Sequence, residues 1–511
     1  MSAAVLLSRG QFAVLAATGV LAAVVLTVAG VYGLLRTLMT LIIATYVSFT
    51  VFKLIAWFAG ARRAIPDRPL PSLDDPALPT YTVLVPLYQE AAVLPGLITA
   101  ITRIRYPTER MQVLLLLETG DDETIETVRR TALPSYVTAV IVPDAGPRTK
   151  PKACNYAMTV ATGEFTVIFD AEDRPEPDHL LKAVAAMWAE RRSDPRVICV
   201  QGILSFWNPR SGIPSVFYWA EYVAHFHWML VGLCRLGLIP PLCGSSNHFR
   251  TEALRHVAEE YGTLTFGRGD RAVTVPSVWD SYNVTEDADL AARLARLDYR
   301  VAMCPARTYE EAPHRLSVAL RQRTRWLQGY LVTGLVQSRR PLRSMRSMGA
   351  MRYLVFIMMM LWTPISALLN PIIWALSATY VLARISGWPV IATFIDDMFP
   401  TPVHYVGLIA MVAGNVALGI QSIVTTLYAT SDRDAGLAKY LSLTFLWWAF
   451  TSLPAYRAAW RLLTARSTWE KTPHGHDQSQ EQSVIRPTAP TFEPVAEASR
   501  PRDESGLVHS G

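Results

Sequence analysis

The chain has 511 residues, of which 51% are hydrophobic and 18% are charged, and its formal net charge is +6. This composition is too apolar for a typical soluble protein. Its basic residues cluster beside apolar runs instead of forming one long stripe, which favours the inner face of a membrane over a nucleic-acid partner. The five cysteines are odd in number and show no CxxC spacing, which indicates a reduced, cytosolic central domain without structural zinc.

Two apolar runs occupy the N-terminal 63 residues. Residues 11–33 carry no charge and are long enough to cross the hydrocarbon core of a bilayer as one helix. The second run, about 37–60, contains only Lys53 and is followed by a basic pair. We expect residues 1–63 to form a transmembrane hairpin with both ends inside, rather than a cleaved signal peptide.

A change in character follows this region. Residues 64–79 contain five prolines, which predicts a linker. From residue 80 to residue 338, short apolar runs alternate with amphipathic stretches, the pattern of buried parallel strands separated by helices. We therefore expect a Rossmann-like α/β domain. Ligands bind at the carboxyl ends of the strands in such sheets, so the polar residues that end each run are the candidate site.

Apolar sequence returns in residues 339–466. The runs are about 353–384, 403–428 and 438–456. The first contains Pro364, so it can be one kinked span, a tight hairpin, or a surface helix followed by a span. The distribution of basic residues is satisfied by two crossings with flanking interface helices, and a four-crossing arrangement stays open. The polar tail, residues 476–511, is predicted to be disordered.

One apolar run ends in a group of acids, which are Asp170, Glu172 and Asp173. Carboxylates grouped at a strand end repel one another unless a cation lies between them, and Mg²⁺ or Mn²⁺ bridging a diphosphate is a common solution. Three cations lie just upstream, which are Arg148, Lys150 and Lys152. A pyrophosphate and a departing nucleotide both need such partners.

Polar residues also end two earlier runs, at the same edge of the expected sheet. Tyr88, Gln89 and Glu90 follow the run that begins at residue 81, and Glu118 ends the next run, with Asp121 and Asp122 beyond it. These residues are placed to hold a base and a ribose.

Two later patterns add candidate residues. Thr285, Glu286 and Asp287 begin a helix, where taken alone they would be an N-cap with acids in the first turn. Gln322, Arg325 and Trp326 lie on a helix just before the apolar region. An exposed Trp beside polar groups is a platform for a sugar ring, although interfacial Trp and Arg are also ordinary membrane anchors.

Two further sets of residues are expected to have a structural role rather than a metal-binding or catalytic one. His225 and His227 have no third ligand in view, so we expect them to pack between helices rather than bind a metal. Cys243 lacks the spacing to a histidine that would indicate a nucleophilic Cys-His pair.

Taken together, these motifs resemble the processive family 2 glycosyltransferases, the group of cellulose, chitin and hyaluronan synthases. The motifs, in order, are VPLYQE (85–90), the acids that end the next run, Lys152, DAED (170–173), CGS (243–245), TED (285–287) and QRTRW (322–326). The resemblance covers roughly residues 80–475. It implies a GT-A catalytic domain on the cytoplasmic side of a multi-pass bacterial inner-membrane protein.

The resemblance also implies roles for the donor-site residues. Asp170 and Glu172 would hold the divalent metal, Mg²⁺ or Mn²⁺, and the diphosphate, with Asp173 as the alternative to Glu172. Glu118, or else Asp121, would contact the uridine, and Lys152 would contact the nucleotide. The other residues expected to bind the nucleotide-sugar are Pro86, Tyr88, Glu90 and Arg325.

For the acceptor side, the resemblance makes Asp287 the catalytic base, with Glu286 and Asp170 as further catalytic residues. The expected acceptor-binding residues are Cys243, Gly244, Ser245, Thr285, Gln322 and Trp326. Residues 467–475 are loosely similar to the gating segment of cellulose synthases, with Trp469, Thr472 and His474 in its conserved positions.

The implied reaction is inverting transfer from a UDP-sugar to the non-reducing end of a growing β-linked polysaccharide, coupled to its translocation. UDP-glucose is the favoured donor, and UDP-N-acetylglucosamine is the alternative. The alternative function is a single transfer to a lipid-linked acceptor. Export partners, if there are any, would be separate chains, and no nucleic-acid partner is expected. A transporter or scaffold with a degenerate domain would release no UDP.

Overall fold

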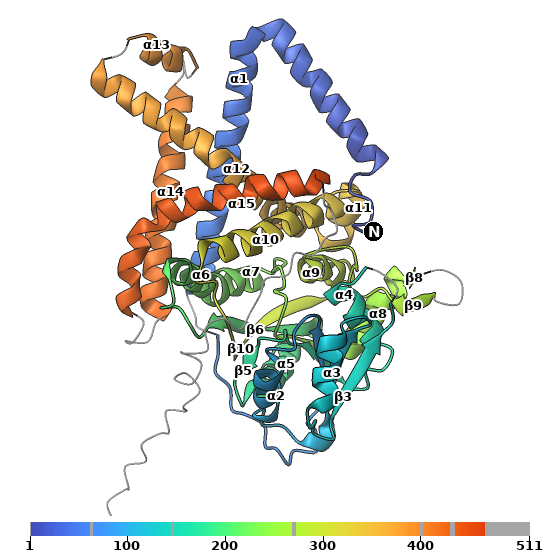
Figure 1. The fold of residues 1–511 in the computed structure, drawn as a ribbon. Helices are drawn as coiled ribbons and strands as arrows, with labels where there is room; N and C mark the ends of the chain where they lie inside the picture. The colour runs from blue at the N-terminus through green and yellow to red at the C-terminus, as the bar shows by residue number, and fades with distance from the viewer. Residues whose placement is uncertain are drawn as a thin grey trace, which may run out of the picture.

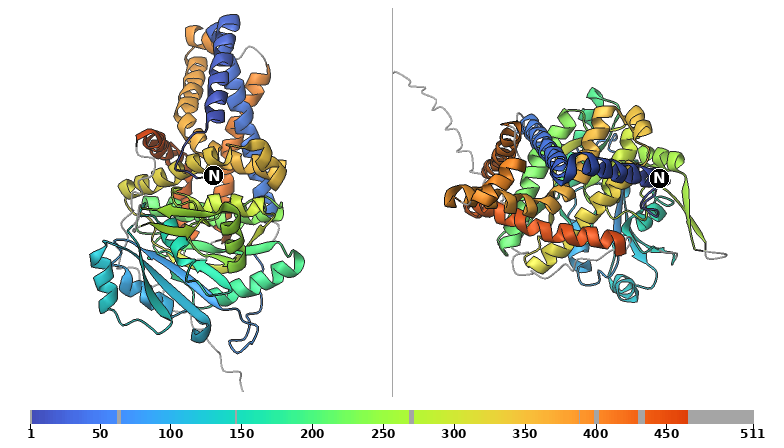
Figure 2. Two further views of the ribbon diagram at one scale, coloured as in Figure 1. Left: turned by 90° about the vertical axis from the view of Figure 1, so that its right-hand side faces the viewer. Right: turned by 90° about the horizontal axis from the view of Figure 1, so that it is seen from above.

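The protein is described by a computed structural model that covers residues 2–61, 65–144, 147–267, 272–387, 389–398, 402–429 and 435–464. An α/β domain lies beneath a layer of helices, and further helices project from that layer (Figure 1). Viewed from the side, the projecting helices form a narrow column above the domain (Figure 2).

Eight strands form one sheet, in the order β3-β2-β1-β4-β7-β6-β10-β5. Their bounds are β1 (Tyr81–Leu87), β2 (Met111–Glu118), β3 (Val137–Val142), β4 (Phe165–Ile168), β5 (Arg174–Pro175), β6 (Val197–Phe206), β7 (Asn247–Arg250) and β10 (Arg300–Glu310). A separate antiparallel pair, β8 (Thr263–Phe266) and β9 (Val273–Pro276), extends from the edge of the domain (Figure 1).

The apolar runs of the sequence become the parallel half of this sheet. β1 pairs in parallel with β2 and β4, and β2 with β3. The expected parallel pairing does not extend to β7, which lies between β4 and β6 and runs antiparallel to both, or to β5, which runs antiparallel to β10. β7 has the polar sequence NHFR, so the search for apolar runs could not find it.

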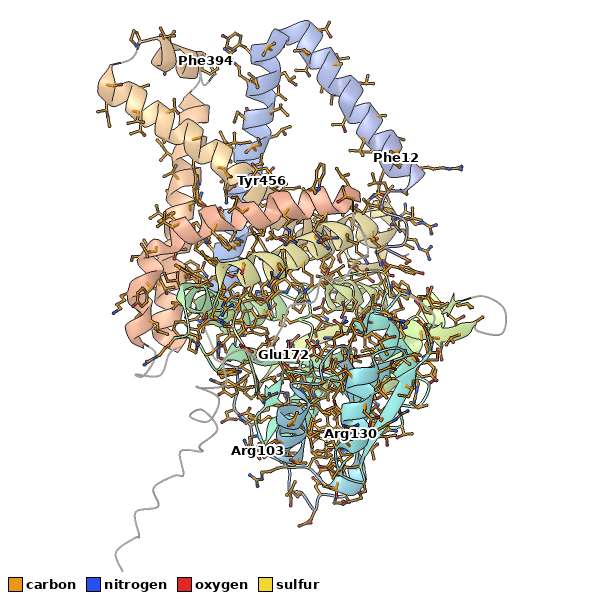
Figure 3. All side chains as sticks on the ribbon, viewed as in Figure 1. Phe12, Arg103, Arg130, Glu172, Phe394 and Tyr456 are labelled. Carbon is orange, nitrogen blue, oxygen red and sulfur yellow. The ribbon has the colours of Figure 1, made fainter. Side chains whose placement is uncertain are left out.

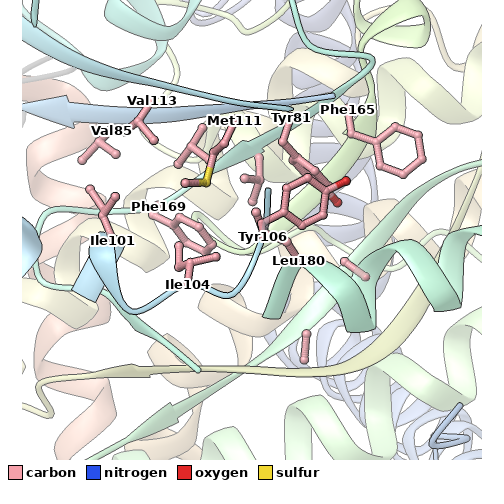
Figure 4. Close-up of a cluster of buried hydrophobic side chains, with 14 of the residues drawn as sticks. Tyr81, Val85, Ile101, Ile104, Tyr106, Met111, Val113, Phe165, Phe169 and Leu180 are labelled. Carbon is pink, nitrogen blue, oxygen red and sulfur yellow. The ribbon is translucent and has the colours of Figure 1, made fainter. Parts of the chain in front are cut away.

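Both faces of the sheet are covered, which explains why the strands read as continuous apolar runs. Along β1, Val83 and Val85 enter one hydrophobic core, while Leu84 enters the core on the opposite face. In the first core, Tyr81 packs edge-on against Phe165 (Figure 4). The sheet is therefore a rigid base whose strand ends hold the loops that follow them.

Helices surround the sheet and form the layer above it. They are α2 (Leu94–Thr102), η1 (Thr108–Arg110), α3 (Asp122–Arg130), α4 (Lys150–Ala157), α5 (His179–Ser193), α6 (Ile213–Ala224), the π-helical segment η2 (His225–Met229), α7 (Leu230–Arg235), α8 (Thr251–Tyr261), α9 (Glu286–Arg296), α10 (Leu316–Gln337) and α11 (Pro341–Met348). The apolar regions give α1 (Arg9–Ala61), α12 (Ala350–Ser386), α13 (Pro389–Met398), α14 (Pro402–Ala429), η4 (Ala435–Leu443) and α15 (Thr444–Thr464).

Two of the described helices are long and apolar enough to cross a membrane, namely α1 and the Ala350–Ala375 part of α12. α1 bends at Gly30, whose φ of 65° is readily available only to glycine, and its two arms diverge below the bend (Figure 1). The bend therefore falls inside the first expected run. α12 continues through Pro364 and Pro371, so its apolar run contains no tight hairpin. α15 packs on both α10 and α12 and lies across the domain.

The C-terminal end of α1 is packed directly on the backbone of the α/β domain. A Cβ atom on Gly232 of α7 would lie 1.8 Å from the Ala56 carbonyl oxygen, and one on Gly60 would lie 2.0 Å from the Trp228 carbonyl oxygen. Glycine at both positions therefore permits an approach that no other residue allows. Arg235 adds a hydrogen bond to the Gly60 carbonyl oxygen at 3.0 Å.

Candidate active site

A cavity of about 400 Å³ lies between the carboxyl ends of the central strands and the helices above them. This volume is within the range of small-molecule binding sites. Glu172 marks its position between the sheet and the overlying helices (Figure 3). The residues predicted from the sequence that line it are Pro86, Tyr88, Glu90, Glu118, Asp170, Glu172, Cys243, Gly244, Ser245, Thr285, Glu286, Asp287, Gln322, Arg325 and Trp326.

Lys152 is one predicted site residue that does not line this cavity. It is buried and is paired with Glu118, which does line it. The three predicted gating residues, Trp469, Thr472 and His474, lie outside the described residues, so that segment stays a prediction.

The acids that follow β4 divide between the cavity and the interior. Asp170 and Glu172 line the cavity. Asp173 is fully buried, and its Oδ2 accepts hydrogen bonds from the Asp170 backbone N–H, at 2.8 Å, and from the Ser245 hydroxyl. Burial, followed by the charges of Asp170 and Glu172, raises the pKa of Asp173. Asp173 therefore orders the turn, and Asp170 and Glu172 are the acids of this turn that line the cavity.

The two lysines of α4 have different partners. Lys150 donates from Nζ to the Asp170 carboxylate and to the Gly244 carbonyl oxygen, the latter at 2.7 Å, and so it lies in the cavity wall. Lys152 donates to Glu118 Oε2 at 2.7 Å, with the two side chains only 3% and 4% exposed. Residues two apart on a helix do not face the same side. Of these two lysines, only Lys150 lines the cavity.

Glu118 and Asp121 are also separated by the structure. Glu118 lines the cavity, and its Oε1 atom is buried without a hydrogen-bond partner among the described residues. Burial raises the pKa of Glu118, against the opposing effect of Lys152. Asp121 instead caps α3 and accepts a hydrogen bond from the Gln89 backbone N–H at 2.5 Å. Of the two alternatives, only Glu118 lines the cavity.

The acids at the start of α9 lie close to Asp170, beside Gly244. A Cβ atom on Gly244 would lie 3.7 Å from Asp287 Oδ2 and 3.8 Å from Asp170 Oδ2. Burial raises the pKa of Asp287 to about 6. Burial, together with the charge of Asp287, raises the pKa of Glu286 to about 8. The pKa is therefore raised further for Glu286 than for Asp287.

Thr285 has a different role from the N-cap that its sequence position suggests. It makes no side-chain hydrogen bond that caps α9. Its hydroxyl instead pairs with the Thr333 hydroxyl of α10 at 2.9 Å. The bond joins the start of α9 to α10, the helix that carries Trp326.

Aromatic side chains form the part of the cavity that faces α6. The Trp326 ring lies 6.2 Å from that of Tyr222 at an interplanar angle of 25°, and 5.5 Å from that of Tyr218. Gln322, one turn earlier on α10, has a buried Oε1 atom without a partner among the described residues. An indole beside an unsatisfied amide oxygen offers both stacking and a hydrogen-bond acceptor to a sugar.

Several cavity residues were missed by the sequence analysis. They are Glu221, Tyr222, His225, Glu310, Arg323 and Tyr330. Glu310 ends β10 just as Glu118 ends β2, so the same strand-end signal could have identified it. The pairing of Glu221 with Arg323 joins α6 to α10 and has no signal in the sequence.

His225 does more than pack between helices, because it lines the cavity. Its Nε2 atom lies 3.8 Å from Cys243 Sγ, and burial lowers the pKa of His225 to about 4. Burial raises the pKa of Cys243, so the pair does not form a thiolate and an imidazolium. Among the described residues, no three His, Cys, Asp or Glu side chains gather into a metal-binding group.

Residues 79–329 match the family described as "Glycosyltransferase like family 2". This segment is a family 2 glycosyltransferase domain. The GT-A, Rossmann-like α/β fold expected from the sequence is thereby confirmed. Within the domain, the strand-end acids, the start of α9 and the Gln322–Trp326 segment meet in one cavity.

The chain is similar to two curated proteins. It is 25% identical over 260 residues to "Probable glycosyltransferase YdaM" of Bacillus subtilis, covering 49% of this chain, and 22% identical over 286 residues to a "Probable glycosyltransferase" of Sulfolobus acidocaldarius, covering 55%. The match spans 55% of the length of each relative.

Solved structures with a similar arrangement have low sequence identity. The mannosyltransferase PcManGT from Pyrobaculum calidifontis, in complex with GDP-Man and Mn²⁺, is 20% identical, with a TM-score of 0.48 and coverage of 84% of this chain and 99% of that one. S. aureus TarS 1-349 in complex with UDP-GlcNAc is 14% identical, with a TM-score of 0.35 and coverage of 74% and 92%.

Proposed function

We propose that the chain is a membrane-embedded, inverting glycosyltransferase that moves a sugar from a nucleoside diphosphate sugar to an acceptor hydroxyl. The observation that carries the proposal is that three kinds of side chain line one cavity. Asp170 and Glu172 offer carboxylates for a metal-bound diphosphate, Asp287 offers a base, and Trp326 offers a stacking surface. Inverting transfer needs the base and the leaving group on opposite sides of the anomeric carbon, and these carboxylates approach the same space from different loops.

In the proposed reaction, Asp287 accepts the proton of the acceptor hydroxyl while that oxygen attacks the anomeric carbon. The bond from the anomeric carbon to the phosphate oxygen breaks, and its electron pair leaves with the nucleoside diphosphate. Lys150 and Arg325 line the cavity and supply positive charge for the leaving group. Glu286, with its raised pKa, keeps its proton and so does not compete with Asp287 as the base.

Asp170 and Glu172 would hold the divalent cation, Mg²⁺ or Mn²⁺. Carboxylate oxygens suit both ions, and the Lys150 ammonium group on Asp170 shows that this position attracts a cation. Because no three His, Cys, Asp or Glu side chains are placed to hold a metal among the described residues, the diphosphate and water would complete the coordination. When bound, the metal neutralises the charge that develops on the diphosphate.

The extent of the cavity supports a polysaccharide acceptor. It runs from Pro86 at the end of β1, past Trp326, to Thr363 in the apolar helix α12. A sugar stacked on Trp326 would therefore lie between the donor site and the helices of the column. We propose that the donor is a UDP-sugar, with UDP-glucose favoured, that the acceptor is the non-reducing end of a growing β-linked polysaccharide, and that elongation is coupled to its translocation.

The position of the apolar helices supports the membrane part of the proposal. Phe12 of α1 and Phe394 of α13 lie on the column side, whereas Arg103 and Arg130 lie at the opposite end of the molecule (Figure 3). None of the residues in the most apolar window of α1 is buried within the protein. A bilayer around the column would shield this surface, and the glycosyltransferase domain would then lie on the cytoplasmic side of a bacterial inner membrane.

The test is a screen for nucleoside diphosphate release by the purified protein, with UDP-glucose, UDP-N-acetylglucosamine and GDP-mannose, each with Mg²⁺ or Mn²⁺. We expect release with one donor, and at least roughly 100-fold less from Asp287→Asn. Equal release by the wild type and Asp287→Asn would contradict the proposal. The length of the product then separates elongation from the alternative, a single transfer to a lipid-linked acceptor.

A further inference from the structure

The first residues of the chain lie against the loop that leads to Asp287. The Ser2 hydroxyl donates to Asp280 Oδ1 at 2.9 Å, and the Ala3 backbone N–H donates to Asp280 Oδ2 at 2.5 Å. Asp280 has no solvent exposure, and the two partners lie 278 and 277 residues away in sequence. A buried carboxylate is stable only with such partners, so this contact holds both segments in place.

A second set of contacts fixes the same N-terminal residues to the end of α10. Arg339 donates to the Ser2 carbonyl oxygen at 2.8 Å and to the Val5 carbonyl oxygen. Leu6 is buried against Val332 and Val336. The segment from residue 2 to residue 8, which we name the N-terminal strap, is therefore held by charge, by hydrogen bonds and by apolar packing.

Hydrogen bonds lead from Asp280 toward Asp287. Asp280 Oδ1 accepts from the Tyr282 backbone N–H at 3.1 Å, and the Asp280 carbonyl oxygen accepts from the Asn283 N–H at 3.0 Å. The Asn283 side chain accepts from the Thr285 N–H at 3.1 Å. Each of these bonds fixes the backbone one step closer to Asp287, two residues beyond Thr285.

The other side of this loop is held independently. Asn283 donates to the Thr333 hydroxyl of α10 at 2.8 Å. Asn155 of α4 accepts from the backbone N–H groups of Val278 and Trp279, at 3.1 and 3.0 Å. The N-terminal strap is thus a third support for the loop, and it comes from a segment of the chain far from α4 and α10 in sequence.

We propose that the N-terminal strap positions the loop of residues 280–287, and thereby sets the place of the Asp287 carboxylate in the cavity. This inference rests on the proposed function for the role of Asp287. Ser2, Ala3 and Asp280 are positioning residues, because none of them lines the cavity. Without the strap, the Asp280 carboxylate loses two hydrogen-bond donors, and the loop opens to let water replace them.

The proposal predicts a local change and a kinetic one. Ala3→Pro removes the N–H that reaches Asp280, because proline has no backbone donor. In the full-length protein we expect the amides of residues 282–285 to exchange with deuterium at least roughly tenfold faster. We expect kcat to fall roughly 10- to 100-fold while the KM for the donor stays unchanged, because the base is displaced but the donor site is not.

Two further variants complete the test. Ser8→Ala is the matched control: it removes the two hydrogen bonds of the Ser8 hydroxyl with Gln11 at the start of α1 but no contact with Asp280, and it should behave as the wild type. Asp280→Asn weakens the same contact from the loop side. Combined with Ala3→Pro, it should add little further loss, since both changes break one interaction.

Unchanged exchange of residues 282–285 in Ala3→Pro would overturn the proposal, and so would equal effects of Ala3→Pro and Ser8→Ala. The exchange measurement does not depend on activity. If the wild type releases no nucleotide, the proposed function fails while the exchange still decides whether the strap holds the loop. If the wild type is active and the exchange is unchanged, only the strap fails.

Discussion

Asp170 and Asp287 face one point in the cavity, the place where a side chain on Gly244 would begin. A Cβ atom there would lie 3.8 Å from Asp170 Oδ2 and 3.7 Å from Asp287 Oδ2, with Lys150 Nζ at 3.5 Å. In the proposed reaction this is the space between the leaving diphosphate and the incoming hydroxyl. The absence of a side chain at Gly244 keeps that space open.

Gly244→Ala should therefore yield a folded protein with little transfer. The new methyl group makes only ordinary van der Waals contacts, so we expect the thermal midpoint to stay within a few degrees of the wild type. It occupies space between the two carboxylates, and we expect kcat/KM to fall roughly 100-fold. Thermal unfolding and nucleotide release measure the two effects. Wild-type turnover in Gly244→Ala would contradict the claim that the reaction takes place beside Gly244.

The activity should depend on the ionisation of Asp287. Burial raises the pKa of Asp287 to about 6, and a general base works only when it is deprotonated. We expect kcat/KM to level off above pH 7 and to fall roughly tenfold per pH unit below pH 6. Far-ultraviolet circular dichroism over the same range controls for acid unfolding. A rate that stays constant down to pH 4.5 in the folded protein would mean that another group accepts the proton.

Lys150 and Lys152 should respond differently to replacement by methionine. Lys152→Met leaves the buried Glu118 carboxylate unpaired and should destabilise the protein by about 3 kcal/mol. Lys150→Met removes a more accessible cation from Asp170, so it should lower transfer roughly 100-fold with a small effect on stability. Chemical denaturation and nucleotide release distinguish the two.

The double variant Lys152→Met with Glu118→Leu is the control for this pair. It removes both buried charges and should recover most of the lost stability, because the unpaired carboxylate is the source of the cost. If it is as unstable as Lys152→Met alone, the ion pair does not account for the effect.

A buried pair of histidines makes part of the stability dependent on pH. His179 donates from Nδ1 to the Arg307 carbonyl oxygen at 2.9 Å, and its Nε2 lies 3.0 Å from Nε2 of His248. Burial lowers the pKa of His179 to about 4. Below pH 6.5 the unfolded chain takes up a proton that the folded protein does not, so this contribution to stability is present above pH 6.5 and is lost as the pH falls to 4.

His179→Gln tests this assignment. We expect the difference in unfolding free energy between the wild type and the variant to shrink by about 2 kcal/mol between pH 7 and pH 5. The comparison cancels the titrating groups that do not contact His179, and it reports on His179 together with its partner His248. A difference that does not change with pH would mean that His179 is protonated in the folded state.

Much of the donor side could be predicted from the sequence, because local patterns determine it. The runs that become β1 and β2 are apolar on both faces, and the acids that end them must lie at one edge of the sheet. Asp170, Glu172 and Glu118 were found in this way. Glu310 at the end of β10 followed the same rule and was overlooked.

The other differences between the expected and the observed structure arise from tertiary packing, which a local sequence pattern does not determine. β7 is buried although polar, because Asn247 donates to the nearby Cys243 carbonyl oxygen and His248 pairs with the distant His179 and Tyr81. The choice between Lys150 and Lys152 depends on the rotation of α4 about its axis, which the basic sequence alone does not set. The contact of Ser2 and Ala3 with Asp280 joins segments that lie 278 and 277 residues apart in the sequence. No periodic sequence pattern indicates such a contact.

The close packing of Gly60 and Gly232 limits how the whole protein can move. With the α1 backbone set against that of α7, the helix can neither slide nor roll on the transferase domain without separating from it. If α1 is anchored in a bilayer, the domain then keeps a constant depth relative to the lipid headgroups. Under the proposed function, the growing sugar chain would have to advance past a stationary enzyme, one residue after each transfer, and could not be carried outward by a swinging domain.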